Sequence, residues 1–158
     1  MKKLIFILLV SLAVVFSVMA CATTTTATTE ESGPFTQEDA NKAFDSIYQK
    51  YHSSLILDGA KNYTVVRGDN LSALAERNFG AGSALYFPVI MLASNEEVDD
   101  PDLIFPGLKL VIPDLKKNLN DPGARSKIKE FLGEIANVYN KKGDAVVEKK
   151  LRDLAATL

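Results

Sequence analysis

Residues 63–75 of this 158-residue chain read YTVVRGDNLSALA, and the spacing of their apolar side chains changes once along the stretch. Residues 63–67 alternate as a short strand does. Gly68 then breaks the alternation, and Asn70 can cap a helix whose apolar stripe begins at Leu71. The stretch therefore predicts a strand, a tight turn and a helix in immediate succession.

The chain that follows predicts a second helix and a second strand. Apolar residues are nearly continuous over residues 83–94, and Pro88 implies that the first half of this helix is irregular. A strand fits Leu108–Ile112, and Pro113 closes it. We expect an α+β fold in which residues 62–114 form a βααβ unit, with two antiparallel strands and both helices on one face of the sheet.

Two blocks of this unit resemble the LysM family. Residues 63–75 depart from the usual family pattern only at Asn70, where Thr is common. Residues 101–113 read PDLIFPGLKLVIP and match the closing pattern of the family almost throughout. Between the blocks, Ser94 stands where the family usually has an Asn that helps to fix the helix end.

LysM modules bind glycans that contain N-acetylglucosamine, chiefly peptidoglycan in bacteria, so the resemblance implies this role here. In the family a shallow groove lies between the loop after the first strand and the loop before the second. The corresponding candidate glycan-binding residues here are Gly68, Asp69, Asn70, Leu71, Leu103, Ile104, Phe105 and Pro106.

The chemistry of these residues suits an N-acetylated sugar, although each also has a structural alternative. An acetamido group needs backbone hydrogen-bonding groups and a small apolar pocket, which Leu71, Ile104 and Phe105 can line. Equally, Gly68 suits a turn, Asp69 suits a helix cap and Leu71 suits the core.

The N-terminal end of the chain has the order of a bacterial signal peptide. Two lysines precede an uncharged apolar stretch that reaches the single cysteine, Cys21. Residues 18–20 resemble a lipobox, with Met19 in place of the usual small residue. We expect residues 1–20 to be removed and Cys21 to carry lipid, so that the exported protein is anchored to a membrane, periplasmic or at the cell surface. An uncleaved anchor and a free thiol are the alternatives.

Three further segments flank the central unit. Residues 21–34 are Thr-rich and predict a flexible linker. Residues 35–58 contain an N-terminal helix that Thr36 can cap, and residues 120–158 predict a C-terminal helical hairpin that begins at Asp121. The apolar faces of these helices need a partner surface, which is either the rest of the chain or another protein.

Composition and residue types argue against several classes of function. The formal net charge of −2 does not favour nucleic acid as a partner. The single imidazole, His52, is predicted on a surface helix without a nucleophile beside it, and no zinc ligand set is present. The acidic run Glu96–Asp102 has the oxygen atoms for a cation site or for glycan hydrolysis, but such runs are usually solvated loops. We therefore expect no catalytic residue, no metal and no cofactor.

The sequence thus favours a non-catalytic, lipid-anchored protein that binds peptidoglycan and tethers a membrane to the cell wall. One alternative is an envelope scaffold or adhesin whose flanking helices bind a partner protein. Another is an accessory subunit of a wall-modifying enzyme.

Overall fold

The computed structural model of the protein describes residues 34–158. The predicted signal peptide, Cys21 and the predicted linker up to residue 33 lie outside the described residues. Within residues 34–158, no helix has both the length and the apolar character needed to cross a membrane.

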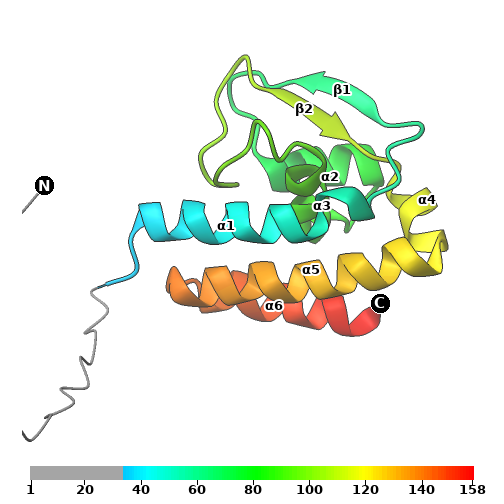
Figure 1. The fold of residues 1–158 in the computed structure, drawn as a ribbon. Helices are drawn as coiled ribbons and strands as arrows, with labels where there is room; N and C mark the ends of the chain where they lie inside the picture. The colour runs from blue at the N-terminus through cyan, green and yellow to red at the C-terminus, as the bar shows by residue number, and fades with distance from the viewer. Residues whose placement is uncertain (1–33) are drawn as a thin grey trace, which may run out of the picture. The chain divides into compact units, whose positions relative to one another are not determined.

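The central unit has the predicted order of two strands and two helices (Figure 1). Strand β1 pairs antiparallel with β2 to form a two-stranded sheet. The α+β class and the βααβ unit are therefore confirmed. The elements of the unit are β1 (Lys61–Thr64), α2 (Leu71–Phe79), the 3₁₀ turn η2 (Ala84–Tyr86), α3 (Phe87–Ala93) and β2 (Lys109–Ile112).

The irregular start of the second predicted helix is also confirmed. Pro88 occupies the first turn of α3, where its missing N–H leaves no helical hydrogen bond unmade. The α-helix therefore begins at Phe87, and the preceding residues form the 3₁₀ turn η2.

Ser94 joins the end of α3 to the sheet. Its Oγ accepts a hydrogen bond from the backbone N–H of Val111 at 2.9 Å and lies 3.3 Å from the carbonyl oxygen of the same residue. These backbone groups of β2 face away from β1, so the hydroxyl satisfies part of the free edge of the sheet. The Ser at this position thus holds α3 against β2.

Four α-helices outside the central unit complete the described part of the chain (Figure 1). The capping box predicted at Thr36 is present, with the Thr36 hydroxyl bonded to the N–H of Asp39 at 3.2 Å. Helices α5 and α6 run antiparallel as the predicted hairpin. The bounds are α1 (Gln37–Tyr51), α4 (Leu115–Asn120), α5 (Pro122–Lys141) and α6 (Ala145–Thr157).

The short helix α4 was not expected from the sequence. Its buried Asn118 binds the backbone of Ile56, accepting from the N–H at 2.8 Å and donating to the C=O at 2.9 Å. The amide thereby pairs two backbone groups of the segment before β1, which has no strand partner there. This contact holds the connection between α1 and β1 against the start of the C-terminal helices.

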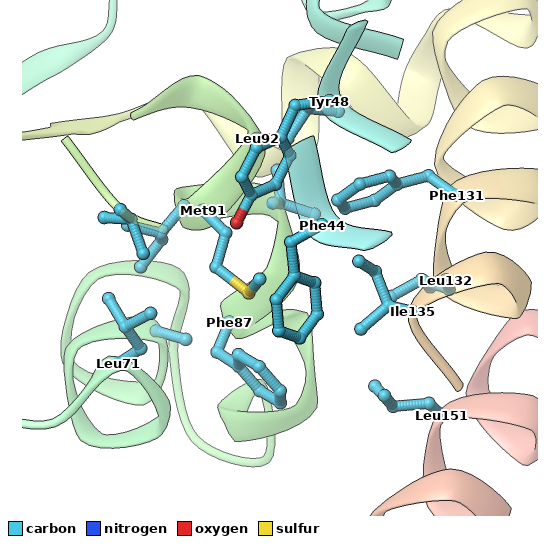
Figure 2. Close-up of a cluster of buried hydrophobic side chains, with 14 of the residues drawn as sticks. Phe44, Tyr48, Leu71, Phe87, Met91, Leu92, Phe131, Leu132, Ile135 and Leu151 are labelled. Carbon is cyan, nitrogen blue, oxygen red and sulfur yellow. The ribbon is translucent and has the colours of Figure 1, made fainter. Parts of the chain in front are cut away.

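One continuous hydrophobic core joins the flanking helices to the central unit (Figure 2). Aromatic rings make several of the contacts between elements, such as Phe87 of α3 against Tyr139 of α5, with centroids 6.1 Å apart. The apolar faces of the flanking helices are therefore covered by the chain itself. The buried side chains that meet in this region include Phe44, Tyr48, Leu71, Phe87, Met91, Leu92, Phe131, Leu132, Ile135 and Leu151.

The acidic run Glu96–Asp102 is not simply a solvated loop, and in this respect the sequence-based expectation was wrong. The Asp100 side chain is only 1% exposed and accepts hydrogen bonds from Lys142 Nζ at 2.7 Å and Gln37 Nε2 at 2.6 Å. Lys142 Nζ also lies 2.8 Å from Asp102. Burial raises the pKa of Asp100, but the hydrogen bonds from Lys142, from Gln37 and from the backbone N–H of Asp102 outweigh it and hold this pKa below its ordinary value.

This ion-pair cluster of Asp100, Asp102 and Lys142 connects the loop before β2 to the end of α5. Between residues 34 and 158, no group of three or more His, Cys, Asp or Glu side chains is arranged to hold a metal ion. Two carboxylates of this loop, the buried one of Asp100 and the exposed one of Asp102, bind Lys142.

Replacing Lys142 with Met is expected to lower the free energy of unfolding by about 3 kcal/mol, because it leaves the Asp100 carboxylate buried without its cation. Urea unfolding at pH 7 measures the change. Lys150→Met, on the exposed face of α6, is the matched control and is expected to have little effect. Equal stability of the two variants would show that the cluster contributes nothing.

Candidate functional site

Backbone hydrogen bonds bring the two predicted binding loops together. Beyond the end of β1, the N–H of Val65 donates to the C=O of Leu108 at 2.9 Å. The C=O of Val65 in turn accepts from the N–H of Gly107, also at 2.9 Å. The first loop therefore begins, and the second loop ends, at residues that are bonded directly to each other, and the two turns lie side by side.

Asp69 organises the first loop. Its side chain is 4% exposed, and its carboxylate accepts hydrogen bonds from the Val66 N–H at 2.9 Å and the Tyr63 hydroxyl at 2.7 Å. Arg77 of α2 lies 3.3 Å from the same carboxylate. The Val66 and Tyr63 hydrogen bonds, together with Arg77, hold the pKa of Asp69 below its ordinary value although burial opposes them. The carboxylate is therefore charged at neutral pH and closes the turn.

The neighbours of Asp69 have separate roles. Gly68 has a φ of +93°, a conformation that favours glycine, so this residue is needed for the turn itself. The helix cap is Asn70, whose Oδ1 accepts from the N–H of Ala73 at 2.8 Å. The sequence had offered Asp69 as an alternative cap, and the structure assigns that task to Asn70.

A groove of about 270 Å³ opens between the two loops. Its lining comes from three parts of the chain: the start of α2 with the residues before it, the loop before β2 with Phe87 of α3, and the C-terminal helices. The lining residues are Asp69, Asn70, Leu71, Ser72, Phe87, Pro101, Asp102, Ile104, Tyr139 and Val147. Leu71 and Phe87 also belong to the buried core, so this part of the lining is rigidly held (Figure 2).

Four of the eight candidate glycan-binding residues line this groove, namely Asp69, Asn70, Leu71 and Ile104. The other four lie on the same two loops but outside the groove lining, with their side chains or backbone turned to solvent. Leu103 is 60% exposed and Phe105 is 61% exposed. Gly68 and Pro106 are the remaining two, and both are exposed.

Sequence reasoning did not name the other lining residues. Pro101 and Asp102 stand at the start of the second family block, so extending the second loop by two positions would have included them. Tyr139 and Val147 carry no such signal. Both occur at helical spacing in the C-terminal segment, where an apolar position predicts packing against the core and says nothing about a distant loop.

The ionisable groups that line the groove are two carboxylates and one phenol. Asp102 accepts a hydrogen bond from the Tyr139 hydroxyl at 3.3 Å. The Nζ of Lys142, which is not part of the lining, lies 2.8 Å from the same carboxylate. Burial raises the pKa of Tyr139, so its hydroxyl remains a donor. Arg77, also outside the lining, forms the corresponding ion pair with Asp69. Each carboxylate is thus paired with a cation that lies outside the groove lining. The Asp102 carboxylate is exposed and can accept further hydrogen bonds, whereas the buried Asp69 carboxylate is used within the first loop.

These features suit the binding of a ligand. A general acid for glycan hydrolysis needs a raised pKa, whereas the pKa of Asp69 is lowered. His52 lies exposed at the end of α1, where its Nδ1 is 3.2 Å from the C=O of Gln49, and it is not part of the groove lining. The groove combines apolar walls with fixed acceptors, which is the composition of a site that holds a small polar ligand.

Comparison with known proteins assigns the central unit to a family. Residues 63–113 match the model of the family described as LysM domain. The resemblance seen in the sequence is therefore confirmed for this segment, which begins at Tyr63 and ends at Pro113. No curated protein and no solved structure matches the chain.

Replacing Asp69 with Asn is expected to lower the free energy of unfolding at pH 7 by about 1–2 kcal/mol, because the charged acceptor of Val66 and Tyr63 is lost. A lowered pKa means that this stabilisation is present above the ordinary pKa of an aspartate and is lost as the pH falls below about 4. Urea unfolding at pH 7 and at pH 3 should show the difference between the chains shrinking in acid.

Asp99→Asn, at an exposed position of the acidic run, is the control for removing one carboxylate. It is expected to change stability little at either pH. A difference between the Asp69 variant and the unmodified chain that stays the same at both pH values would contradict the role assigned to the charged form.

Proposed function

Because residues 63–113 of this chain are a LysM domain, we propose that the protein is a non-catalytic binder of glycans that contain N-acetylglucosamine, with peptidoglycan as its ligand. The observation that carries the proposal is the groove between the two loops of that domain, since its lining combines apolar side chains with fixed hydrogen-bonding groups.

The size and lining of the groove support a sugar ligand. Its volume of about 270 Å³ lies just below the range of about 300–1,000 Å³ typical of sites for drug-sized molecules, which suits one sugar unit at a time. Leu71 and Ile104 offer apolar contact for an acetamido methyl group. Asp102 and the exposed backbone of the loops can pair with hydroxyl and amide groups.

The charge of the lining favours an uncharged sugar. No lysine or arginine occurs among the described residues that line the groove, whereas two aspartates, Asp69 and Asp102, do. The cations that pair with these carboxylates, Arg77 and Lys142, lie outside the lining, so an anionic sugar in the groove would contact the carboxylates and no cation. N-acetylglucosamine is neutral, and we therefore propose that this unit of the peptidoglycan strand occupies the groove.

The N-terminal sequence supports a tethering role. Lipid on Cys21 would hold one end of the protein in a membrane while the LysM domain binds the cell wall. A protein built in this way is exported and joins the two layers of the envelope. We propose this arrangement as the biological setting of the glycan-binding activity.

The packing of the flanking helices favours this proposal over a scaffold. The apolar faces of α1, α5 and α6 are buried in the core that they share with the LysM domain. Among the large apolar side chains of these three helices, only Val146 is strongly exposed. No specific observation therefore favours a partner protein or an enzyme complex.

Co-sedimentation with purified peptidoglycan tests the binding role. The unmodified chain is expected to sediment with the polymer, and Ile104→Ala is expected to weaken retention about tenfold because it removes apolar contact within the groove. Leu57→Ala changes an exposed apolar residue outside the groove and is expected to sediment as the unmodified chain does. Failure of the unmodified chain to sediment would reject the proposal.

Mass spectrometry of the N-terminal peptide tests the anchor. We expect the mature chain to begin at Cys21 and to carry the mass of a diacylglycerol thioether, while Cys21→Ser should retain the leader and lack the lipid. An N-terminal peptide that contains an unmodified Cys21 thiol would overturn the proposed anchor without affecting the glycan-binding role.

A further inference from the structure

The groove has a wall that the LysM domain does not supply. Tyr139 of α5 and Val147 of α6 line it together with the two loops, and both residues lie beyond the end of the family match at residue 113. The C-terminal hairpin therefore contributes to the site itself as well as to the core. This contribution gives the hairpin a role in ligand selection, which rests on the function proposed above.

The ion-pair cluster fixes this wall relative to the second loop. Lys142, next to the end of α5, lies 2.7 Å from Asp100 and 2.8 Å from Asp102. The Tyr139 hydroxyl donates to the same Asp102 at 3.3 Å. Because Asp102 and Tyr139 both line the groove, part of the contact that holds the hairpin in place is made by the groove lining itself.

The turn between α5 and α6 is fixed in the same way. The N–H of Asp144 donates to the C=O of Tyr139 at 2.9 Å, and the Asp144 carboxylate caps α6 by accepting from the N–H of Val147 at 2.9 Å. The two wall residues are thus connected through a single capping residue. A wall held this firmly loses little conformational freedom when a ligand binds against it.

The two adjacent valines at the start of α6 have different surroundings. Val147 is partly buried, packs against the core and lines the groove. Val146 is 63% exposed and is not part of the lining. Of the two valines, Val147 is therefore the one that lines the groove, and Val146 provides an internal comparison in the same helical turn.

We propose that the α5–α6 hairpin is a specificity-determining wall of the glycan groove, with Val147 in direct contact with the bound N-acetylated sugar. The wall closes one side of the space between the two loops. Tyr139 acts as a positioning residue, since its hydroxyl holds Asp102 at the edge of the groove.

The test is titration of the full chain, in detergent micelles, with an oligomer of three N-acetylglucosamine units, followed by calorimetry. Val147→Ala is expected to bind about tenfold more weakly than the unmodified chain, because two methyl groups of the wall are lost. Val146→Ala makes the same chemical change at the exposed neighbour and is expected to bind as the unmodified chain does. Thermal unfolding of both variants compares their stability.

NMR signals of the valine methyl groups in the unmodified chain give a second measurement, which does not depend on whether a variant folds. The Val147 methyl signals are expected to shift on addition of the oligomer, and the Val146 signals to stay in place. The wall would be overturned, and the proposed function left intact, if the unmodified chain bound tightly, the two alanine variants had equal affinities and the Val147 methyl signals did not shift. Absence of binding by the unmodified chain would overturn both.

Discussion

The site depends on the two backbone hydrogen bonds of Val65. Its N–H and C=O are both bonded to the loop before β2, one to Leu108 and one to Gly107. Without this pairing, the loop that Asp69 closes and the loop that carries Ile104 would be two separate surface turns. Because the pairing uses backbone atoms alone, the side chains of both loops remain available to shape the space between them, and that space is the groove.

A second constraint is the coupling of this small unit to the flanking helices. A two-stranded sheet is marginal by itself and needs a hydrophobic face packed against helices. Here α3 supplies that face on one side and is itself buried against α1 and α5 in a common core. The Asp100–Lys142 pair adds a polar contact to this apolar interface. Moving α5 away from the loop would leave the Asp100 carboxylate buried without its cation, which is unfavourable.

Local patterns predicted most of the fold because the relevant physics is local. Four of these signals act within a few residues, and the structure has each at its predicted position. They are the break at Gly68, the caps at Asn70 and Thr36, and the proline in α3. The predicted strand ends were less accurate. Strand β1 ends at Thr64, although the backbone of Val65 still forms hydrogen bonds to the loop before β2.

The features that were missed depend on residues far apart in the chain. Asp100 and Lys142 are separated by 42 positions, and no local pattern distinguishes a buried carboxylate in an acidic run from its solvated neighbours. The same limit applies to the groove, where Tyr139 and Val147 join a surface defined by residues more than thirty positions away. Half of the candidate residues line the groove because the family blocks contain both of the loops beside it, while the direction of each loop side chain follows from tertiary packing.

The arrangement has a consequence for how binding and folding are connected. Leu71 and Phe87 are core residues whose surfaces also line the groove, and Asp102 both lines it and pairs with Lys142. A ligand seated among these residues contacts α2, the loop before β2 and the hairpin at once, and therefore favours the arrangement in which all three are packed. Some of the contacts that stabilise the fold therefore also shape the site, and we expect that loosening the hairpin changes the groove.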